Sequence, residues 1–63
     1  MKVRDIIKKV EADGWIQVRV RGSHRVYKHS TKRGHVTIPG HPGDDVRPGT
    51  LDSIYKQAQI PKE

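Results

Sequence analysis

The stretch WIQVRVRGSHRVYKH, residues 15–29, has the pattern of a β-hairpin. From Trp15 to Val20 apolar and polar side chains alternate, as expected of a half-buried strand. The alternating apolar residues are Ile16, Val18 and Val20. Gly22-Ser23 then gives a tight connection, and Arg25 to His29 is a second strand candidate. This stretch therefore predicts two adjacent strands joined by a short turn.

The second strand can face a hydrophobic core in two ways. With Val26 toward the core, His24 would lie on the core side. With Tyr27 toward the core, Arg25 and His29 share that side and His24 points to the opposite face. We prefer the second arrangement, because Tyr27 buries more area and its ring tolerates a polar neighbour at its tip. His24 lies at the edge of the strand, where it is accessible in either case.

Two amphipathic helices flank the hairpin. In the first, from Val3 to Asp13, apolar residues recur at i, i+3, i+4 and i+7, and Gly14 is placed to stop it. The second begins at Pro48, repeats the same spacing and ends near Gln59. The two apolar stripes are Val3, Ile6, Ile7 and Val10, and Leu51, Ile54, Tyr55 and Ala58.

A third strand and a long loop lie between the hairpin and the second helix. His35 to Pro39 reads as a strand with Val36 and Ile38 on one face. The segment PGHPGDDVRPG follows, and its three prolines and three glycines exclude regular structure. The order predicts a small α+β domain, αβββα, with a three-stranded antiparallel sheet and both helices on one of its faces. We expect one domain over residues 1–60 and a short tail at 61–63.

Composition restricts the classes of function. A chain of 63 residues has no room for a large closed pocket, so any active site must lie on the surface. The chain has no cysteine, which excludes disulfides and cysteine-based zinc sites. No apolar run reaches membrane-spanning length, and the N-terminus lacks the apolar stretch of a signal peptide. We expect a cytoplasmic protein that does not bind membranes.

The charge is unevenly distributed. The 13 lysines and arginines outnumber 7 acidic residues, giving a net charge of +6. From Gly14 to Pro42 there is no Asp or Glu, and this segment holds all four histidines. Its cations are Arg19, Arg21, Arg25, Lys28, Lys32 and Arg33. One face should therefore be positive, which favours a polyanionic partner such as RNA or an acidic protein.

Four segments, in order, carry a family likeness. DGW after the first helix, RGSHRVYKH, VTIPGH and PGTLDSIYKQA closely resemble the HicA toxins of bacterial and archaeal toxin–antitoxin pairs, over Lys2 to Ile60. The resemblance implies a double-stranded-RNA-binding-like fold, cleavage of mRNA, and a HicB-type antitoxin as partner. It also implies that the histidine of the Gly-Ser-His motif, here His24, is catalytic. The final helix departs from ordinary duplex-binding domains because it lacks their lysine cluster, having only Arg47 before it and Lys56 within it.

The residues themselves suit metal-independent cleavage of RNA. A base removes the proton of the 2′-OH, which attacks phosphorus, and an acid protonates the departing 5′-oxygen. Histidine serves both transfers, because its ordinary pKa of about 6.5 lies near working pH. DNA lacks the 2′-OH, so we expect no action on DNA. We assign His24 to proton transfer; the phosphate would be held by the turn and its neighbours, namely Arg21, Gly22, Ser23, Arg25 and Lys28.

Other residues have weaker claims. His29 and His41 are auxiliary candidates for the second proton transfer. The histidine spacings and the absence of cysteine argue against a zinc site, and we expect no metal or other cofactor. Trp15 and Tyr55 could in principle stack on bases. We expect half-buried packing for Trp15 and a place in the core for Tyr55 instead.

Two further readings remain open. One is a non-catalytic module that binds structured RNA, with steep salt dependence and no cleavage. The other is an adaptor for an acidic protein that binds no nucleic acid. In the leading reading, an acidic antitoxin on the positive face would block access to RNA and neutralise the charge together.

Overall fold

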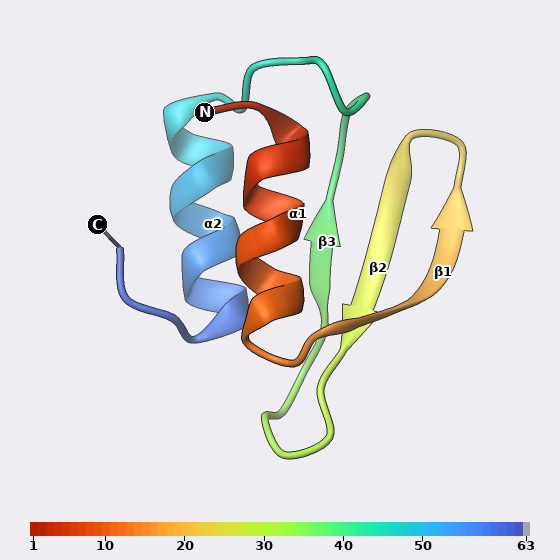
Figure 1. The fold of residues 1–63 in the computed structure, drawn as a ribbon, viewed down its shortest axis with the longest axis vertical. Coiled ribbons are helices and arrows are strands. Elements are labelled where there is room, and N and C mark those ends of the chain that lie inside the picture. Colours follow the sequence, from red (N-terminus) through yellow and green to blue (C-terminus); the bar gives the residue numbers. More distant parts are fainter. Residues whose placement is uncertain (63) are drawn as a thin grey trace.

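The computed structural model describes residues 1–62, which form two helices and three strands. In chain order these are α1 (Val3–Ala12), β1 (Ile16–Arg21), β2 (His24–Lys28), β3 (Val36–Ile38) and α2 (Pro48–Ala58) (Figure 1). Each predicted element is present, and no end differs from the predicted one by more than one residue. The predicted α+β class with the order αβββα is confirmed.

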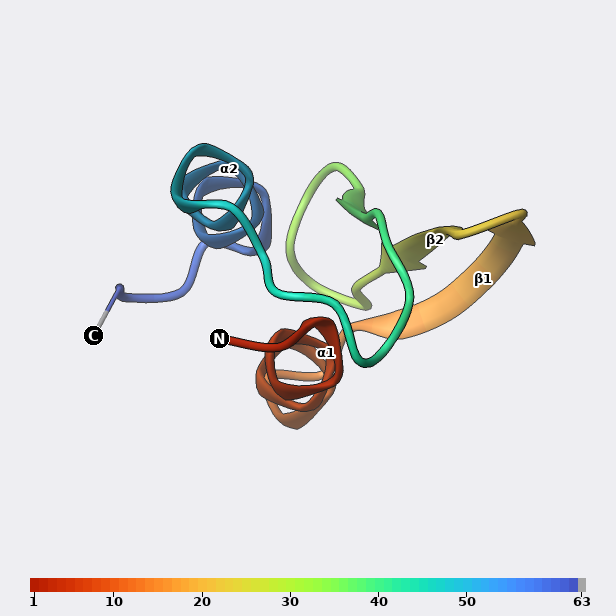
Figure 2. The ribbon, with the colours of Figure 1, turned by 90° about the horizontal axis from the view of Figure 1, so that it is seen from above.

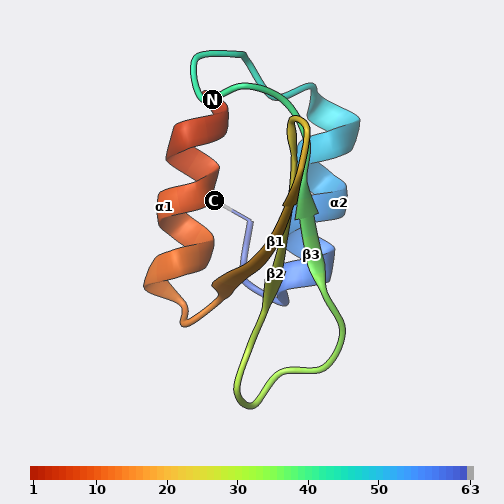
Figure 3. The same cartoon turned by 90° about the vertical axis from the view of Figure 1, so that its right-hand side faces the viewer.

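The sheet is antiparallel with the spatial order β1-β2-β3, so β2 is central and the other two strands are edges. Both helices lie on the same side of the strands when the molecule is seen from above (Figure 2). Figure 3 shows the strands running in front of the two helices. The core between these layers is Val3, Ile6, Val10, Trp15, Tyr27, Val36, Ile38, Ile54, Tyr55 and Ala58.

The orientation of β2 follows from its burial and its pairing. Tyr27 is 1% exposed and pairs with Val36, which is also buried. Because side chains alternate along a strand, Arg25 shares the side of Tyr27, and His24 points away from the helices. The preferred arrangement of the second strand is therefore confirmed.

The expectation that β1 is half-buried is wrong. All six of its residues are exposed, with Ile16 at 65%, Val18 at 54% and Val20 at 55%. The strand lies at the sheet edge beyond the helices, and its register shifts between Gln17 and Arg19. A bulge at this point breaks the alternation of side chains, so the three apolar residues do not form a stripe facing the core.

Trp15 is also more buried than expected. Its side chain is 1% exposed rather than half-buried, and its indole Nε1–H donates to the carbonyl of Ala58 at 3.2 Å. This bond satisfies the one polar atom of the ring inside the core. Trp15 thus joins the start of β1 to the end of α2 and is not available for stacking on bases. Tyr55 is 6% exposed, which confirms its place in the core.

The long loop before α2 closes over the start of α1. The carbonyls of Asp44 and Pro42 accept from the backbone N–H groups of Val3 and Arg4, at 2.9 and 3.1 Å. These N–H groups belong to the first turn of the helix and have no partner within it. The loop is therefore a structural cap as well as a connection.

Candidate functional site

His24 is presented by a two-residue turn between β1 and β2. Gly22 has φ of +59°, whereas Ser23 does not have a positive φ. A positive φ at the first central residue alone is typical of a type II′ turn, which requires glycine there. The turn closes the pair Arg21–His24, and His24 is exposed. The predicted tight connection at Gly22-Ser23 is confirmed.

His24 lies on the side of the sheet that faces away from the helices, called here the open face. On β2 this face carries His24, Val26 and Lys28, since the intervening Tyr27 is buried. Directly paired residues share a face, which adds partners from the neighbouring strands. Those partners are Arg21 beside His24, Arg19 and Thr37 beside Val26, and Ile16 beside Lys28.

Three cationic side chains share the open face with His24. Arg19, Arg21 and Lys28 are all exposed. No hydrogen bond or ion pair involves their side chains within residues 1–62. Their charge is therefore available to an external anion. Arg21 and Lys28 were predicted phosphate ligands, whereas Arg19 was counted only as part of the basic segment.

A depression of about 580 Å³ lies on the open face next to these cations. It is lined by Val18, Arg19, Val26, Lys28, His35 and Thr37. His35 was not among the predicted site residues. The alternation of β3 could have revealed it, because Val36 and Ile38 face the core and His35 must then face the other way.

The structure does not bring Arg25 together with these cations. Arg25 lies on the side of Tyr27, and its guanidinium Nη1 donates to the carbonyl of Gly40 at 2.7 Å. It therefore ties β2 to the loop that follows β3. The sequence shows a basic residue next to His24, but the pleat of the strand places the two side chains on opposite faces.

His29 is engaged at both ring nitrogens. Nδ1 accepts from the backbone N–H groups of Thr31 and Lys32, at 3.1 and 3.2 Å. Nε2 lies 2.6 Å from the backbone carbonyl of Asp13. Acceptance at Nδ1 requires a lone pair there, so Nε2 carries the proton and donates. The ring also packs edge-on against Trp15, with centroids 5.2 Å apart. His29 thus has a structural role.

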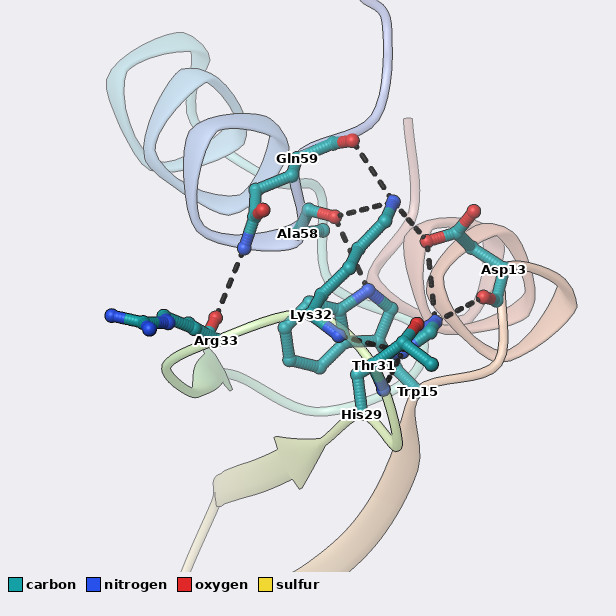
Figure 4. A network of polar contacts seen from close by, with 8 residues as sticks. All are labelled: Asp13, Trp15, His29, Thr31, Lys32, Arg33, Ala58 and Gln59. Carbon is teal, nitrogen blue, oxygen red and sulfur yellow. Dashed lines mark hydrogen bonds and ion pairs between the residues drawn. The ribbon is translucent and has the colours of Figure 1, made fainter.

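Lys32 is the centre of the polar network shown in Figure 4. Its ammonium donates to the carboxylate of Asp13 at 2.6 Å and to the carbonyls of Ala58 and Gln59, at 3.2 and 3.0 Å. The hydrogen bond from Lys32 holds the pKa of Asp13 below its ordinary value. Lys32 therefore connects the ends of both helices and does not contribute to the open face.

His41 lies in the loop held by Arg25. Its backbone N–H donates to the carboxylate of Asp44 at 3.0 Å, and the residue is exposed. Arg25 follows His24 and binds Gly40, the residue before His41. The loop and the turn that precedes His24 are therefore at the same end of the sheet, at the top of Figure 1. His29 follows the opposite end of β2.

Within residues 1–62, no group of three or more His, Cys, Asp or Glu side chains is placed to hold a metal ion. None of the helices in the same range is long and apolar enough to cross a membrane. The open face presents an exposed imidazole among cations, and an imidazole can accept a proton from a hydroxyl or donate one to a departing oxygen.

Comparison with known proteins identifies a family. A family model described as HicA toxin of bacterial toxin-antitoxin matches residues 3–60, nearly the whole chain. No curated protein matches the chain.

Proposed function

The chain belongs to the HicA toxin family, and we propose that it is a metal-independent endoribonuclease that cleaves mRNA and is inhibited by a HicB-type antitoxin. The family supplies the toxin–antitoxin setting. The chemistry is inferred from the open face. The observation that carries the proposal is the position of His24, exposed at a type II′ turn between unpaired cations.

In the proposed reaction His24 accepts the proton of a ribose 2′-OH. The 2′-oxygen attacks the adjacent phosphorus, the bond from phosphorus to the 5′-oxygen breaks, and that oxygen takes up a proton. The products are a 2′,3′-cyclic phosphate and a 5′-OH. Arg21, beside His24 in the register, stabilises the charge that develops on the phosphate oxygens. Lys28, further along β2, binds a neighbouring phosphate of the same strand. The backbone at Gly22-Ser23 is uncovered, since nothing lies within 4 Å of a Cβ placed on Gly22, and can approach the phosphate closely.

The second proton transfer is assigned to His41 in preference to His29. Both ring nitrogens of His29 have partners inside the protein. His41 is exposed, and its loop is fixed at the same end of the sheet as His24 through Arg25. A single general acid or base contributes about 10²–10⁴-fold in rate, so one histidine supports a slow nuclease.

The antitoxin is proposed to bind the open face. A net charge of +6 and the cations beside His24 favour an acidic partner. An inhibitor that covers His24 excludes RNA directly, so inhibition needs no conformational change in the toxin.

The test is expression of wild type, His24→Ala and His41→Ala, with mapping of RNA ends and assay of the purified proteins on synthetic RNA. His24→Ala should lower the cleavage rate by about 10²–10⁴-fold. Growth arrest should disappear, while thermal unfolding stays close to wild type, because the side chain is exposed. Antitoxin binding should persist, because the cations of the open face remain. Cleavage should continue in EDTA and fail on RNA with a 2′-deoxyribose at the cut. Undiminished cleavage by His24→Ala would show that another residue is responsible.

The alternative, a non-catalytic RNA-binding module, is supported by one observation. Among the described residues, His24 is the only exposed histidine in the β1–β2 hairpin. A second histidine for the second proton transfer must therefore come from a separate loop. This alternative predicts salt-dependent RNA binding that is unchanged by His24→Ala, with no cleavage at any pH.

A further inference from the structure

The depression on the open face is distinct from the turn that presents His24. Its two apolar residues, Val18 and Val26, come from β1 and β2, and Arg19 and Lys28 supply positive charge beside them. Along β2, Lys28 is four residues from His24, or about 13 Å at the usual rise of a strand. The depression is therefore a neighbour of the proposed cleavage site and too far along the strand to take part in the same proton transfer.

The aromatic residues of the chain narrow what this surface can bind. Trp15, Tyr27 and Tyr55 are all buried, so none can stack on a base. The imidazoles of His24 and His35 lie on the open face. His35 is exposed and lines the depression together with the apolar residues. Histidine is one of the rings on which proteins stack unpaired RNA bases.

We propose that this depression binds one unpaired nucleotide of the RNA strand that is cut at His24. The base rests on Val18 and Val26 against the imidazole of His35, and Lys28 and Arg19 bind the flanking phosphates. The inference rests on the proposed function, because it makes the same RNA strand the ligand of both places.

The lining favours a single strand over a duplex. A duplex presents phosphates and 2′-hydroxyls to a protein surface, and an apolar floor offers these groups nothing. An unpaired base has an apolar face that Val18 and Val26 can cover. A volume of about 580 Å³ is within the range of ordinary small-ligand sites. The nucleotide bound there fixes which phosphate reaches His24, so the depression sets the register of cleavage.

The experiment measures binding separately from cleavage. The probe is a short single-stranded RNA, fully 2′-O-methylated so that it cannot be cut. Its affinity for the protein is measured by fluorescence anisotropy at several salt concentrations. The variants are His35→Ala and Lys28→Ala. The matched control is Lys56→Ala, which removes one exposed lysine from α2, away from the open face.

His35→Ala is expected to weaken binding by about tenfold or more without changing the salt dependence, because it removes a stacking surface. Lys28→Ala should reduce the slope of log Kd against log salt by about 0.7, the value for one phosphate contact on a single strand. Lys56→Ala should bind with nearly the wild-type affinity. On cleavable RNA, His35→Ala should raise KM and leave kcat nearly unchanged.

Several outcomes would overturn the inference. One is wild-type affinity in both His35→Ala and Lys28→Ala, and another is equal or tighter binding of duplex RNA. A loss in His35→Ala that Lys56→Ala matches would also overturn it, since the effect would then be general. The nuclease assignment fails separately: absence of cleavage by the wild type, with the binding differences retained, rejects the enzyme and supports the subsite.

Discussion

The ammonium of Lys32 lies 2.6 Å from the carboxylate of Asp13 and also binds two carbonyls at the end of α2. A lysine from the most basic segment of the chain is thus used to join the ends of two helices. The ionised form of Asp13 is favoured in the folded protein, because the hydrogen bond from Lys32 lowers its pKa below 3.8. The stability that this contact contributes is fully present above the ordinary carboxyl pKa and is lost as the pH falls through the lowered value.

The first prediction concerns acid unfolding. Lys32→Met should destabilise the protein at neutral pH and flatten the loss of stability below about pH 4, because the cause of the lowered pKa is gone. Lys2→Met is the matched control, since it breaks the pair of Lys2 with Asp45 at 3.2 Å, whose side chains are 42% and 76% exposed. Denaturant unfolding of both variants between about pH 2 and pH 7 measures the difference. Identical pH profiles for wild type and Lys32→Met would contradict the prediction.

The second prediction separates two histidines of the same motif. His29→Ala should lower the free energy of unfolding by about 1–3 kcal/mol, because it leaves the N–H groups of Thr31 and Lys32 without their acceptor. His24→Ala should change it by less than about 0.5 kcal/mol, since that side chain is exposed and has no partner in the described residues. Chemical denaturation gives both changes in the free energy of unfolding. A larger loss for His24→Ala than for His29→Ala would contradict the structural role of His29.

The third prediction concerns the turn. Gly22→Ala places a side chain at φ +59°, a left-handed conformation that costs about 1–2 kcal/mol for a residue with a Cβ. Because no atom of a more distant residue lies within 4 Å of the added Cβ, this cost arises within the backbone of the turn itself. Gly43→Ala is the control, an equally open glycine without positive φ. Cleavage should fall further in Gly22→Ala than its stability loss explains, because the turn positions His24. Equal activity of the two alanine variants would speak against that role.

The fourth prediction concerns the exposed edge. Ile16→Thr and Val20→Thr should leave the free energy of unfolding within about 0.5 kcal/mol of wild type and reduce self-association, because they remove apolar surface from an unpaired strand edge. Val36→Thr, at a fully buried position of β3, should cost about 1–3 kcal/mol. Denaturation and light scattering compare the three. A large loss of stability at Ile16 or Val20 would mean that β1 is covered.

Sequence reasoning succeeded where a local pattern determines the outcome. The apolar spacing from Val3 to Val10 fixes a helix, and Gly22-Ser23 fixes a turn, because each depends on neighbouring residues alone. The greater area of Tyr27 correctly gave the facing of β2.

It failed where the outcome depends on partners distant in the chain. The alternation in β1 indicates two faces but does not indicate whether a helix covers either of them. Val18 and Val20 are exposed because β1 is an edge strand. Arg25 and Lys32 carry charges that the sequence assigns to a surface, but Gly40 and Asp13 engage them. The alternation in β3 predicts which way His35 faces, but its place beside Lys28 is set by the register between the strands.

The position of β1 has a consequence for local unfolding. Its six residues are exposed, and it pairs with β2 alone, so it separates from the sheet at little cost while the core remains intact. Its amides should therefore exchange with solvent before those of β3. The pair of Arg21 with His24 opens together with β1. The surroundings of His24 therefore exchange between a closed hairpin and an open one. Any ligand that bridges Arg21 on β1 and Lys28 on β2 binds only the closed hairpin, and it shifts that equilibrium in proportion to its affinity.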